Sequence, residues 1–244
     1  MTKSVRYWAV IPAAGTGTRM QATLPKQYLT VNNKPVIEYT LSAFCNHERI
    51  SGVVVAISPQ DTCWTNLRIA AHPKIRTITG GEERCHSVLN CLYYLRGIAD
   101  VDDWVLVHDA VRPCISKQDI DILIRELNGH PAGGLLALPV RDTMKRADDR
   151  NIVCETVDRD KLWHALTPQM FHLGDLTGAI EAAVEKGQIV TDECQAMEMT
   201  GAKPLLVRGR FQNIKVTHKD DLPLVELYLK QVTIQITGEG NQVL

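Results

Sequence analysis

The sequence lacks several features that would each point to a particular class of protein. It has no excess charge of one sign, since 27 Lys and Arg face 28 Asp and Glu among 244 residues. No apolar run approaches the roughly 18 residues of a membrane span. Its seven scattered cysteines contain no C-x-x-C pair, and no internal repeat or low-complexity tract is present. These absences argue against a nucleic-acid-binding protein, a membrane protein, a structural zinc site and a disulfide framework. We therefore expect reduced cysteines, a cytoplasmic location and anionic ligands held by local clusters of charge.

What is present is typical of a globular α/β protein, with 45% hydrophobic and 23% charged residues. Short apolar runs predict strands at 7–11, 53–57, 75–78, 104–107 and 134–140. Helical spacing predicts helices at 36–45, more weakly at 61–71, and at 84–95 and 116–127. Strands that alternate with helices imply right-handed crossovers and a mostly parallel sheet covered on both faces. We expect one domain over residues 1–244.

The alternation stops after residue 140, where a long polar stretch begins. A turn-like tip at 148–151 lies between two possible strands, which predicts a protruding β-hairpin arm at about 140–162. Helical periodicity returns at 173–186, 192–199 and 222–232, with a short strand at 204–207. Ser116 and Asp119 predict a capping box, and Thr191 is expected to cap the helix that follows it.

A loop of small residues follows the first strand and reads PAAGTGTRM over 12–20. Such a loop at the carboxyl end of a parallel strand lets backbone N–H groups approach phosphate oxygens. It matches neither G-x-G-x-x-G, because Met20 stands at the third small position, nor the P-loop motif, because of the position of Lys26. Arg19 and Lys26 could converge on a triphosphate. A tight turn with two solvated cations explains the same spacing equally well.

Two further segments follow predicted strands at the same sheet edge. Gly80 and Gly81 open a helix that carries Ser87, and this pattern fits either a ligand contact or an ordinary Gly turn. Asp109 follows the fourth strand, where a carboxylate can meet Mg²⁺ or a ligand hydroxyl, or simply cap a loop. His108 and His164 lie in apolar runs without partners at ligand spacing, so we expect them in the core or in supporting positions and not at a metal.

Motifs in the same order along nearly the whole chain resemble the 2-C-methyl-D-erythritol 4-phosphate cytidylyltransferase family of the non-mevalonate isoprenoid pathway. They lie at 12–20, 25–28, 80–88, 107–113 (VHDAVRP), 139–145 (PVRDTMK), 156–159 (TVDR), 163–169 (WHALTPQ), 191–193 (TDE) and 213–217 (NIKVT). The resemblance implies a Rossmann-like nucleotidyltransferase fold. It also implies transfer of the cytidylyl group of CTP to methylerythritol 4-phosphate, with release of pyrophosphate.

The resemblance also implies roles for individual residues. Arg19 and Lys26 would stabilise the transition state, and Arg159 and Lys215 would orient the acceptor phosphate. Asp109, Arg112 and Thr143 would contact the acceptor, and Asp109 would also stand close to Mg²⁺ or another divalent cation. The residues implied to line the CTP pocket are Ala13, Ala14, Gly15, Gly81, Glu82, Ser87 and Ala110. The arm would reach over the second subunit of a homodimer and help to complete its site.

The sequence departs from the family pattern at two positions. Glu82 stands beside the Gly pair where Asp is common, and Gln212 precedes Asn213 where an acid is common. Two alternatives stay open at this point. The chain could use another polyol phosphate, such as ribitol 5-phosphate, or it could be a nucleotide-binding module without turnover.

Overall fold

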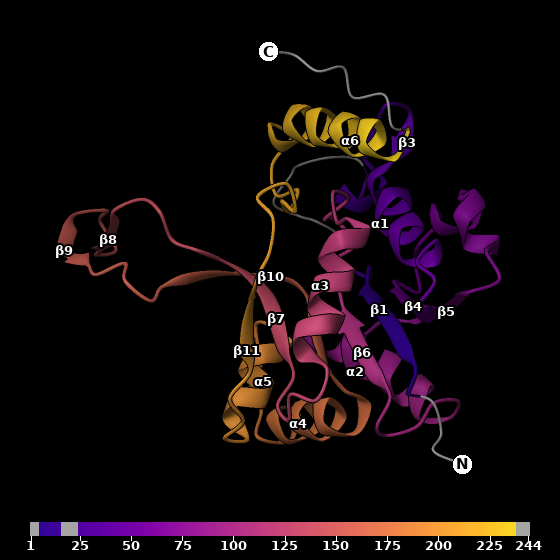
Figure 1. Cartoon of the computed structure of the whole chain (residues 1–244), viewed down its shortest axis with the longest axis horizontal. Coiled ribbons are helices and arrows are strands. Elements are labelled where there is room, and N and C mark those ends of the chain that lie inside the picture. Colours follow the sequence, from indigo (N-terminus) through magenta and orange to yellow (C-terminus); the bar gives the residue numbers. More distant parts are fainter. Residues whose placement is uncertain (1–4, 16–23, 238–244) are drawn as a thin grey trace.

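The computed structural model describes residues 5–15 and 24–237, and a seven-stranded sheet forms its centre (Figure 1). The strand order is β11 (Leu205–Arg208), β7 (Gly134–Pro139), β10 (Trp163–His172), β6 (Trp104–Val107), β1 (Tyr7–Pro12), β4 (Ile50–Ile57) and β5 (Ile75–Thr79). Neighbouring strands are parallel except around β10, which is antiparallel to both β6 and β7. The predicted α/β class with a mostly parallel sheet is confirmed.

Helices cover both faces of the sheet because successive strand residues point to opposite sides. In β1, Ile11 belongs to a core shared with α1 (Val36–Cys45) and α3 (Lys117–Leu127), whereas Val10 belongs to the core on the other face. The elements of that second face are α2 (Arg84–Arg96), α4 (Leu173–Glu185) and α5 (Glu193–Met199). A third, smaller core lies under α6 (Asp221–Thr237) and beside the short hairpin of β2 (Thr30–Val31) and β3 (Lys34–Pro35).

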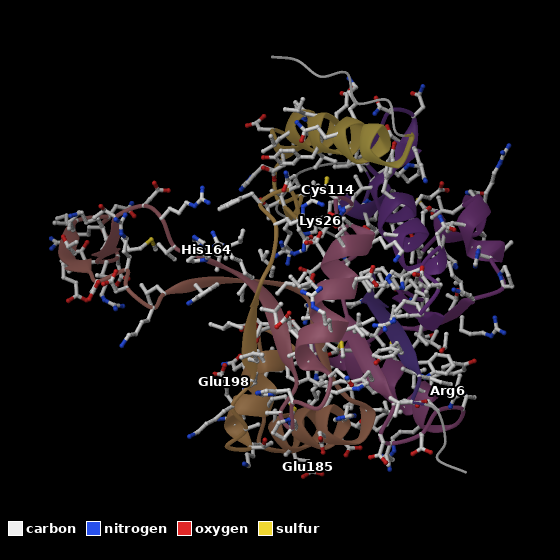
Figure 2. All side chains as sticks on the ribbon, in the orientation of Figure 1. Arg6, Lys26, Cys114, His164, Glu185 and Glu198 are labelled. Atoms are coloured by element: carbon white, nitrogen blue, oxygen red, sulfur yellow. The ribbon has the colours of Figure 1, made fainter. Side chains whose placement is uncertain are left out.

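The predicted arm is present as a separate two-stranded sheet of β8 (Met144–Ala147) and β9 (Val153–Val157). It projects away from the body of the molecule, and its strands are almost entirely exposed (Figure 1). At its root the guanidinium of Arg141 stacks 3.8 Å from the ring centre of Phe211. His164 also lies at this root and is exposed, so the expectation of a core position for it is wrong (Figure 2).

Sequence reasoning missed β10, the ten-residue strand by which the chain returns from the arm into the sheet. Pro168 interrupts the apolar pattern and cannot donate a ladder hydrogen bond. The register of β10 against β7 shifts between Ala165 and Gln169, so the proline lies in an irregularity of the pairing. Thr167, next to this irregularity, contacts Asp109 of the candidate site.

Two smaller local predictions are also wrong. The weak helix expected at 61–71 consists of two short 3-10 turns, Trp64–Asn66 and Arg68–Ala71. The Asp61 carboxylate accepts hydrogen bonds from the N–H groups of Cys63 and Trp64, and such local bonds compete with a helix. The expected cap of α5 at Thr191 lies one residue further on, where the Asp192 side chain accepts a hydrogen bond from the N–H of Gln195. By contrast, the Ser116–Asp119 capping box is confirmed.

Candidate active site

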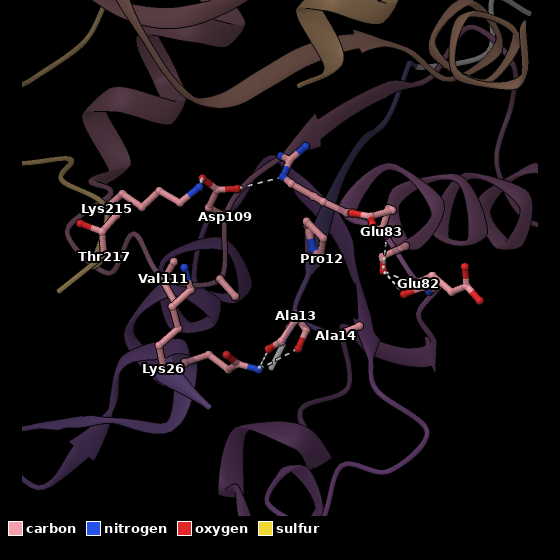
Figure 3. Close-up of a pocket in the computed structure, with 16 residues that line it drawn as sticks. Pro12, Ala13, Ala14, Lys26, Glu82, Glu83, Asp109, Val111, Lys215 and Thr217 are labelled. Atoms are coloured by element: carbon pink, nitrogen blue, oxygen red, sulfur yellow. Dashed lines mark hydrogen bonds and ion pairs between the residues drawn. The ribbon is translucent and has the colours of Figure 1, made fainter. Parts of the chain in front are cut away.

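A cavity of about 450 Å³ opens at the carboxyl edge of the sheet, beside β1 and β6 (Figure 3). From β1 the chain crosses over to β4 and β5 on one side, and β6 then joins β1 from the other side. In open α/β sheets, such a reversal of strand order leaves a crevice in which ligands bind. The cavity is thus where the topology by itself predicts a ligand.

One wall of the cavity is the segment that follows β1. The side-chain amide of Gln27 donates hydrogen bonds to the carbonyl oxygens of Ala13, at 2.9 Å, and Gly15, at 3.1 Å. These two hydrogen bonds to buried Gln27 hold the backbone of residues 13–15 in one conformation. Lys26 precedes Gln27 in a 3-10 turn, and its side chain also lines the cavity (Figure 3).

The opposite wall is the turn between β5 and α2. A side chain at Gly80 would overlap Ala14, so only glycine allows the two walls to meet this closely. Ser87 accepts a hydrogen bond from the N–H of Gly81 at 3.1 Å, which fixes the turn to the first turns of α2. The two loops that sequence reasoning singled out therefore pack against each other at one end of the cavity.

Asp109 lies at the end of β6 and is surrounded by cations. Its Oδ1 is 3.2 Å from Arg84 Nε, and its Oδ2 is 2.9 Å from Lys215 Nζ and 3.4 Å from Arg112 Nε. The Lys215–Asp109 pair stands on one side of the cavity in Figure 3. Arg84 in turn forms a bidentate ion pair with Glu193, in which Nη1 and Nη2 lie 2.6 and 3.1 Å from the two carboxylate oxygens.

Asp109 and Arg84 keep each other ionised despite burial. Burial opposes ionisation of Asp109, but Arg84, Lys215 and Arg112 hold the pKa of its carboxyl far below the ordinary value. Burial likewise disfavours the charge on Arg84, yet Glu193 and Asp109 raise its pKa above the ordinary value. Asp109 and Arg84 therefore carry opposite charges near neutral pH.

Uncharged groups support Asp109 from behind. The Asp109 N–H donates to Thr167 Oγ1 at 3.2 Å, and the same hydroxyl is 2.9 Å from Nδ1 of His108. Burial lowers the pKa of His108 to about 3, so its imidazole is neutral. The Asn213 side-chain amide donates to the backbone carbonyl of Thr167 at 2.7 Å, and the backbone carbonyl of Asn213 accepts a hydrogen bond from Arg112 at 2.8 Å. These bonds connect β6, β10 and the segment after β11.

Most of the site residues predicted from the sequence meet at this cavity. Those that line it are Ala13, Ala14, Gly15, Lys26, Gly81, Glu82, Ser87, Asp109, Ala110 and Lys215. Arg112 lies behind Asp109 and touches it. Arg19 lies outside the described residues. Thr143 and Arg159 lie on the arm, exposed and apart from the cavity of the same chain. The roles assigned to all these residues stay predictions.

Sequence reasoning gave no role to Arg84, Glu193, Gln27 or Thr167, although each belonged to a quoted motif. Arg84 and Glu193 are 109 positions apart, and no local pattern links them. The signal that could have found them is their shared position, because each begins a helix at the same sheet edge. A basic residue that begins one helix and an acidic residue that begins another would have been the pair to test.

The described residues do not form a metal site of their own. Among them, no group of three or more His, Cys, Asp and Glu side chains comes close enough to hold an ion. Asp109 is a single carboxylate, and both of its oxygens already face cations. A metal ion here would need most of its ligands from phosphate oxygens and water, as Mg²⁺ commonly does.

Comparisons with known proteins agree on one family. The family model of 2-C-methyl-D-erythritol 4-phosphate cytidylyltransferase matches residues 7–231. The proteins of that name from Vibrio vulnificus and Pseudomonas fluorescens are 51% and 49% identical to this chain, and each match covers 91% of this chain and 94% of the relative. The crystal structure of the protein of that name from Francisella tularensis has a TM-score of 0.81 at 37% identity, with 91% of this chain and 99% of that chain covered. Within the described residues no helix is long and apolar enough to cross a membrane.

Proposed function

The chain belongs to the 2-C-methyl-D-erythritol 4-phosphate cytidylyltransferase family, and from that premise we propose how its cavity performs the family reaction. The chain is a nucleotidyltransferase of isoprenoid precursor synthesis. It transfers the cytidylyl group of CTP to 2-C-methyl-D-erythritol 4-phosphate and forms 4-diphosphocytidyl-2-C-methyl-D-erythritol and pyrophosphate. The observation that carries the proposed mechanism is the set of fixed cations around Asp109, in one cavity with Lys26.

Both reactants are anions, and their repulsion opposes the approach of the acceptor phosphate to the α-phosphorus of CTP. Positive side chains held in place before the reaction offset that repulsion without reorganising. An oxygen of the acceptor phosphate forms the new bond to the α-phosphorus. The bond from the α-phosphorus to the bridging oxygen breaks in line, and pyrophosphate leaves with the electron pair. A phosphate monoester is already nucleophilic near neutral pH, so the step needs no general base.

The proposed roles divide between the nucleotide and the acceptor. Lys26, together with Arg19, meets the charge that develops on the α-phosphoryl group and on the leaving pyrophosphate. The segment from Ala13 to Gly15, the Gly81 turn and Ser87 hold the nucleotide. Lys215, oriented by Asp109 at 2.9 Å, faces the acceptor phosphate. Arg112 acts through Asp109, which it contacts at 3.4 Å.

We propose that a divalent cation such as Mg²⁺ enters with CTP. When bound it would neutralise charge on the triphosphate, and Asp109 would stand close to it. Because the three cations around Asp109 already neutralise it, the phosphate oxygens would supply the main ligands. Titration of CTP binding with and without Mg²⁺ tests whether phosphate oxygens supply the main ligands, with D109N as the comparison. If CTP binding no longer requires Mg²⁺ in D109N, Asp109 is a main ligand and this part of the proposal is wrong.

The arm supports the proposal of a homodimer in which Thr143 and Arg159 serve the cavity of the partner. Both residues are exposed and belong to an arm that projects from the body (Figure 1). Met144, Val153 and Trp163 add exposed apolar side chains in and beside the same segment. A surface of this kind is suited to cover another copy of the chain.

Mixing two inactive variants tests the arm in trans. K26A damages the cavity and R159A damages the arm, so each variant alone should turn over slowly. In a two-fold dimer with random exchange, about a quarter of the sites regain both side chains. We expect recovery of roughly that share of wild-type activity after exchange. Absence of recovery, with subunit exchange verified by mass, would show that Arg159 does not act across subunits.

The acceptor is tested by pyrophosphate release from CTP with either methylerythritol 4-phosphate or ribitol 5-phosphate. Faster turnover of the first supports the proposed reaction, and faster turnover of the second supports the alternative cytidylyltransferase. CTP binding without release in the presence of either acceptor and Mg²⁺ would support a binding module.

We propose that the chain works in the cytoplasm, where its cysteines stay reduced. Those seven cysteines are free thiols.

A further inference from the structure

At the wall of the cavity, one partly buried ion pair connects the first residues of two helices. Arg84 begins α2, and Glu193 begins α5 and is 1% exposed. The Arg84 Nη1 and Nη2 atoms lie 2.6 and 3.1 Å from the two carboxylate oxygens of Glu193. Such a pairing of a planar guanidinium with both oxygens fixes direction as well as distance.

The remaining edge of the same guanidinium reaches the active site. Arg84 Nε donates to Asp109 Oδ1 at 3.2 Å, so Arg84 is held between two carboxylates. Asp109 then presents its other oxygen, Oδ2, to Lys215 at 2.9 Å. We propose that Glu193 is a positioning residue that holds Arg84 on Asp109, and thereby sets the place of Lys215, the cation that faces the acceptor phosphate. This inference rests on the proposed function of Lys215.

The position of Glu193 is itself fixed by the sheet. The N–H of its neighbour Cys194 donates to Gln169 Oε1 at 2.7 Å, and Gln169 Nε2 donates to Asp192 at 3.0 Å. Gln169 lies on β10 and pairs with Val107, two residues before Asp109 on the chain. The start of α5 is thus tied to the strand next to the one that carries Asp109.

Charge gives Glu193 a second effect on the same cavity. The cluster holds three cations, Arg84, Arg112 and Lys215, and two carboxylates, Asp109 and Glu193, for a formal net charge of +1. Without the Glu193 charge the net value is +2, and Arg84, which lines the cavity, loses one of its two anchors. A released Arg84 would then pair with phosphate instead of with Asp109. By this inference, Glu193 also keeps Arg84 from holding the product pyrophosphate.

Glu193→Gln tests this inference because it keeps the side chain's shape and removes its charge. The matched control is Glu181→Gln, which breaks an exposed arginine–glutamate pair at 3.4 Å, between Arg96 and Glu181. We expect E193Q to lower kcat and raise the KM for the acceptor, with a combined loss of about tenfold to a hundredfold, as misplacement of a positioning group typically does. The KM for CTP should change by less than about threefold, and pyrophosphate should inhibit at lower concentration.

A purely structural role would give a different result. E193Q would then lose thermal stability but keep wild-type kcat and KM per folded molecule, and that outcome overturns the inference. An equal loss for CTP and acceptor also overturns it. R84K is the second variant, because lysine keeps the charge but cannot bridge both carboxylates, and it should reproduce the acceptor defect. If E193Q does not fold, R84K and E193D supply the same readout.

The wild-type enzyme in the same assay distinguishes failure of the proposed function from failure of the inference about Glu193. If the wild type releases pyrophosphate with neither acceptor, the proposed function fails. If the wild type and E181Q are active and E193Q matches them, the function stands and the inference about Glu193 fails.

Discussion

Asp109 and Arg159 belong to the same predicted site, but the chain holds them in opposite ways. Asp109 is buried and touches side chains from three other parts of the chain, Arg84, Arg112 and Lys215. Arg159 is exposed on the arm, and its guanidinium donates to the carbonyl of Arg141 at the arm's other branch. The charges around Asp109 are thus held by contacts within one chain, whereas the exposed Arg159 is open to contact with another surface. The comparison predicts that loss of the buried Asp109 charge changes both stability and catalysis, and that substitutions on the arm leave the fold intact.

The largest effect on stability is expected for Asp109→Asn. Loss of this charge leaves three buried or half-buried cations without their shared partner, which typically costs about 3–5 kcal/mol of unfolding free energy. Urea unfolding of the two proteins measures it. A difference below about 1 kcal/mol would mean that the cluster relaxes into solvent, and the contrast with the arm would then be lost.

The difference in unfolding free energy between the wild type and D109N should depend on pH in one direction. The pKa of Asp109 is depressed in the folded state, so its stabilisation is complete above the unfolded value of about 3.9 and is lost as pH falls toward the folded value. The gap in unfolding free energy between wild type and D109N should therefore be constant from about pH 7 to 5 and narrow below about pH 4. A gap that widens in acid contradicts the assignment.

The largest effect on catalysis is expected for Lys26→Ala. Loss of one preorganised cation typically costs about 3–4 kcal/mol in the transition state, or on the order of 10²- to 10³-fold in turnover. Steady-state pyrophosphate release measures kcat, and the exposed Lys203→Ala serves as the control. An unchanged melting temperature shows that the fold is intact. Near wild-type turnover would remove Lys26 from the mechanism.

A smaller effect is expected for Gln27→Ala, which removes both hydrogen bonds that hold the segment after β1. The carbonyls of buried Ala13 and exposed Gly15 then lose a donor. We expect a cost of about 1–2 kcal/mol, or roughly tenfold in the affinity for CTP. Calorimetric titration of CTP measures the change. The acceptor KM should stay near the wild-type value, because the segment that Gln27 holds is assigned to the nucleotide in the proposed mechanism. A change confined to the acceptor would show that the segment does not bind nucleotide.

The smallest effect is expected on the arm. Arg146→Ala breaks the pair with Glu155 at 2.6 Å, but both side chains are more than half exposed. Exposed pairs contribute little, and a loss below about 0.5 kcal/mol is expected in urea unfolding. A loss as large as that of D109N would show that the arm is integrated into the folding unit, and it would erase the distinction drawn between the two regions.

Much of the fold was predictable because its signals are local. Alternation of buried strands and helices fixed the layers, the polar stretch with a turn at its tip indicated the arm, and Ser116 with Asp119 indicated a helix start. The antiparallel strand β10 escaped because its stability comes from pairing with β6 and β7, while its own residues include Pro168. The expected helix at 61–71 failed for a similar reason, since Asp61 satisfies backbone N–H groups in another way.

By itself, the sequence determined which loops would stand at one sheet edge, because the carboxyl ends of parallel strands share that edge and small residues mark it. It also determined the family, through motifs spread over most of the chain. Only the tertiary structure decided how the charges are paired there. Arg84 reaches Glu193 across 109 positions, and Lys215 reaches Asp109 across more than 100. Ion pairs of this kind depend on three-dimensional distance and burial, which no periodicity along the chain records.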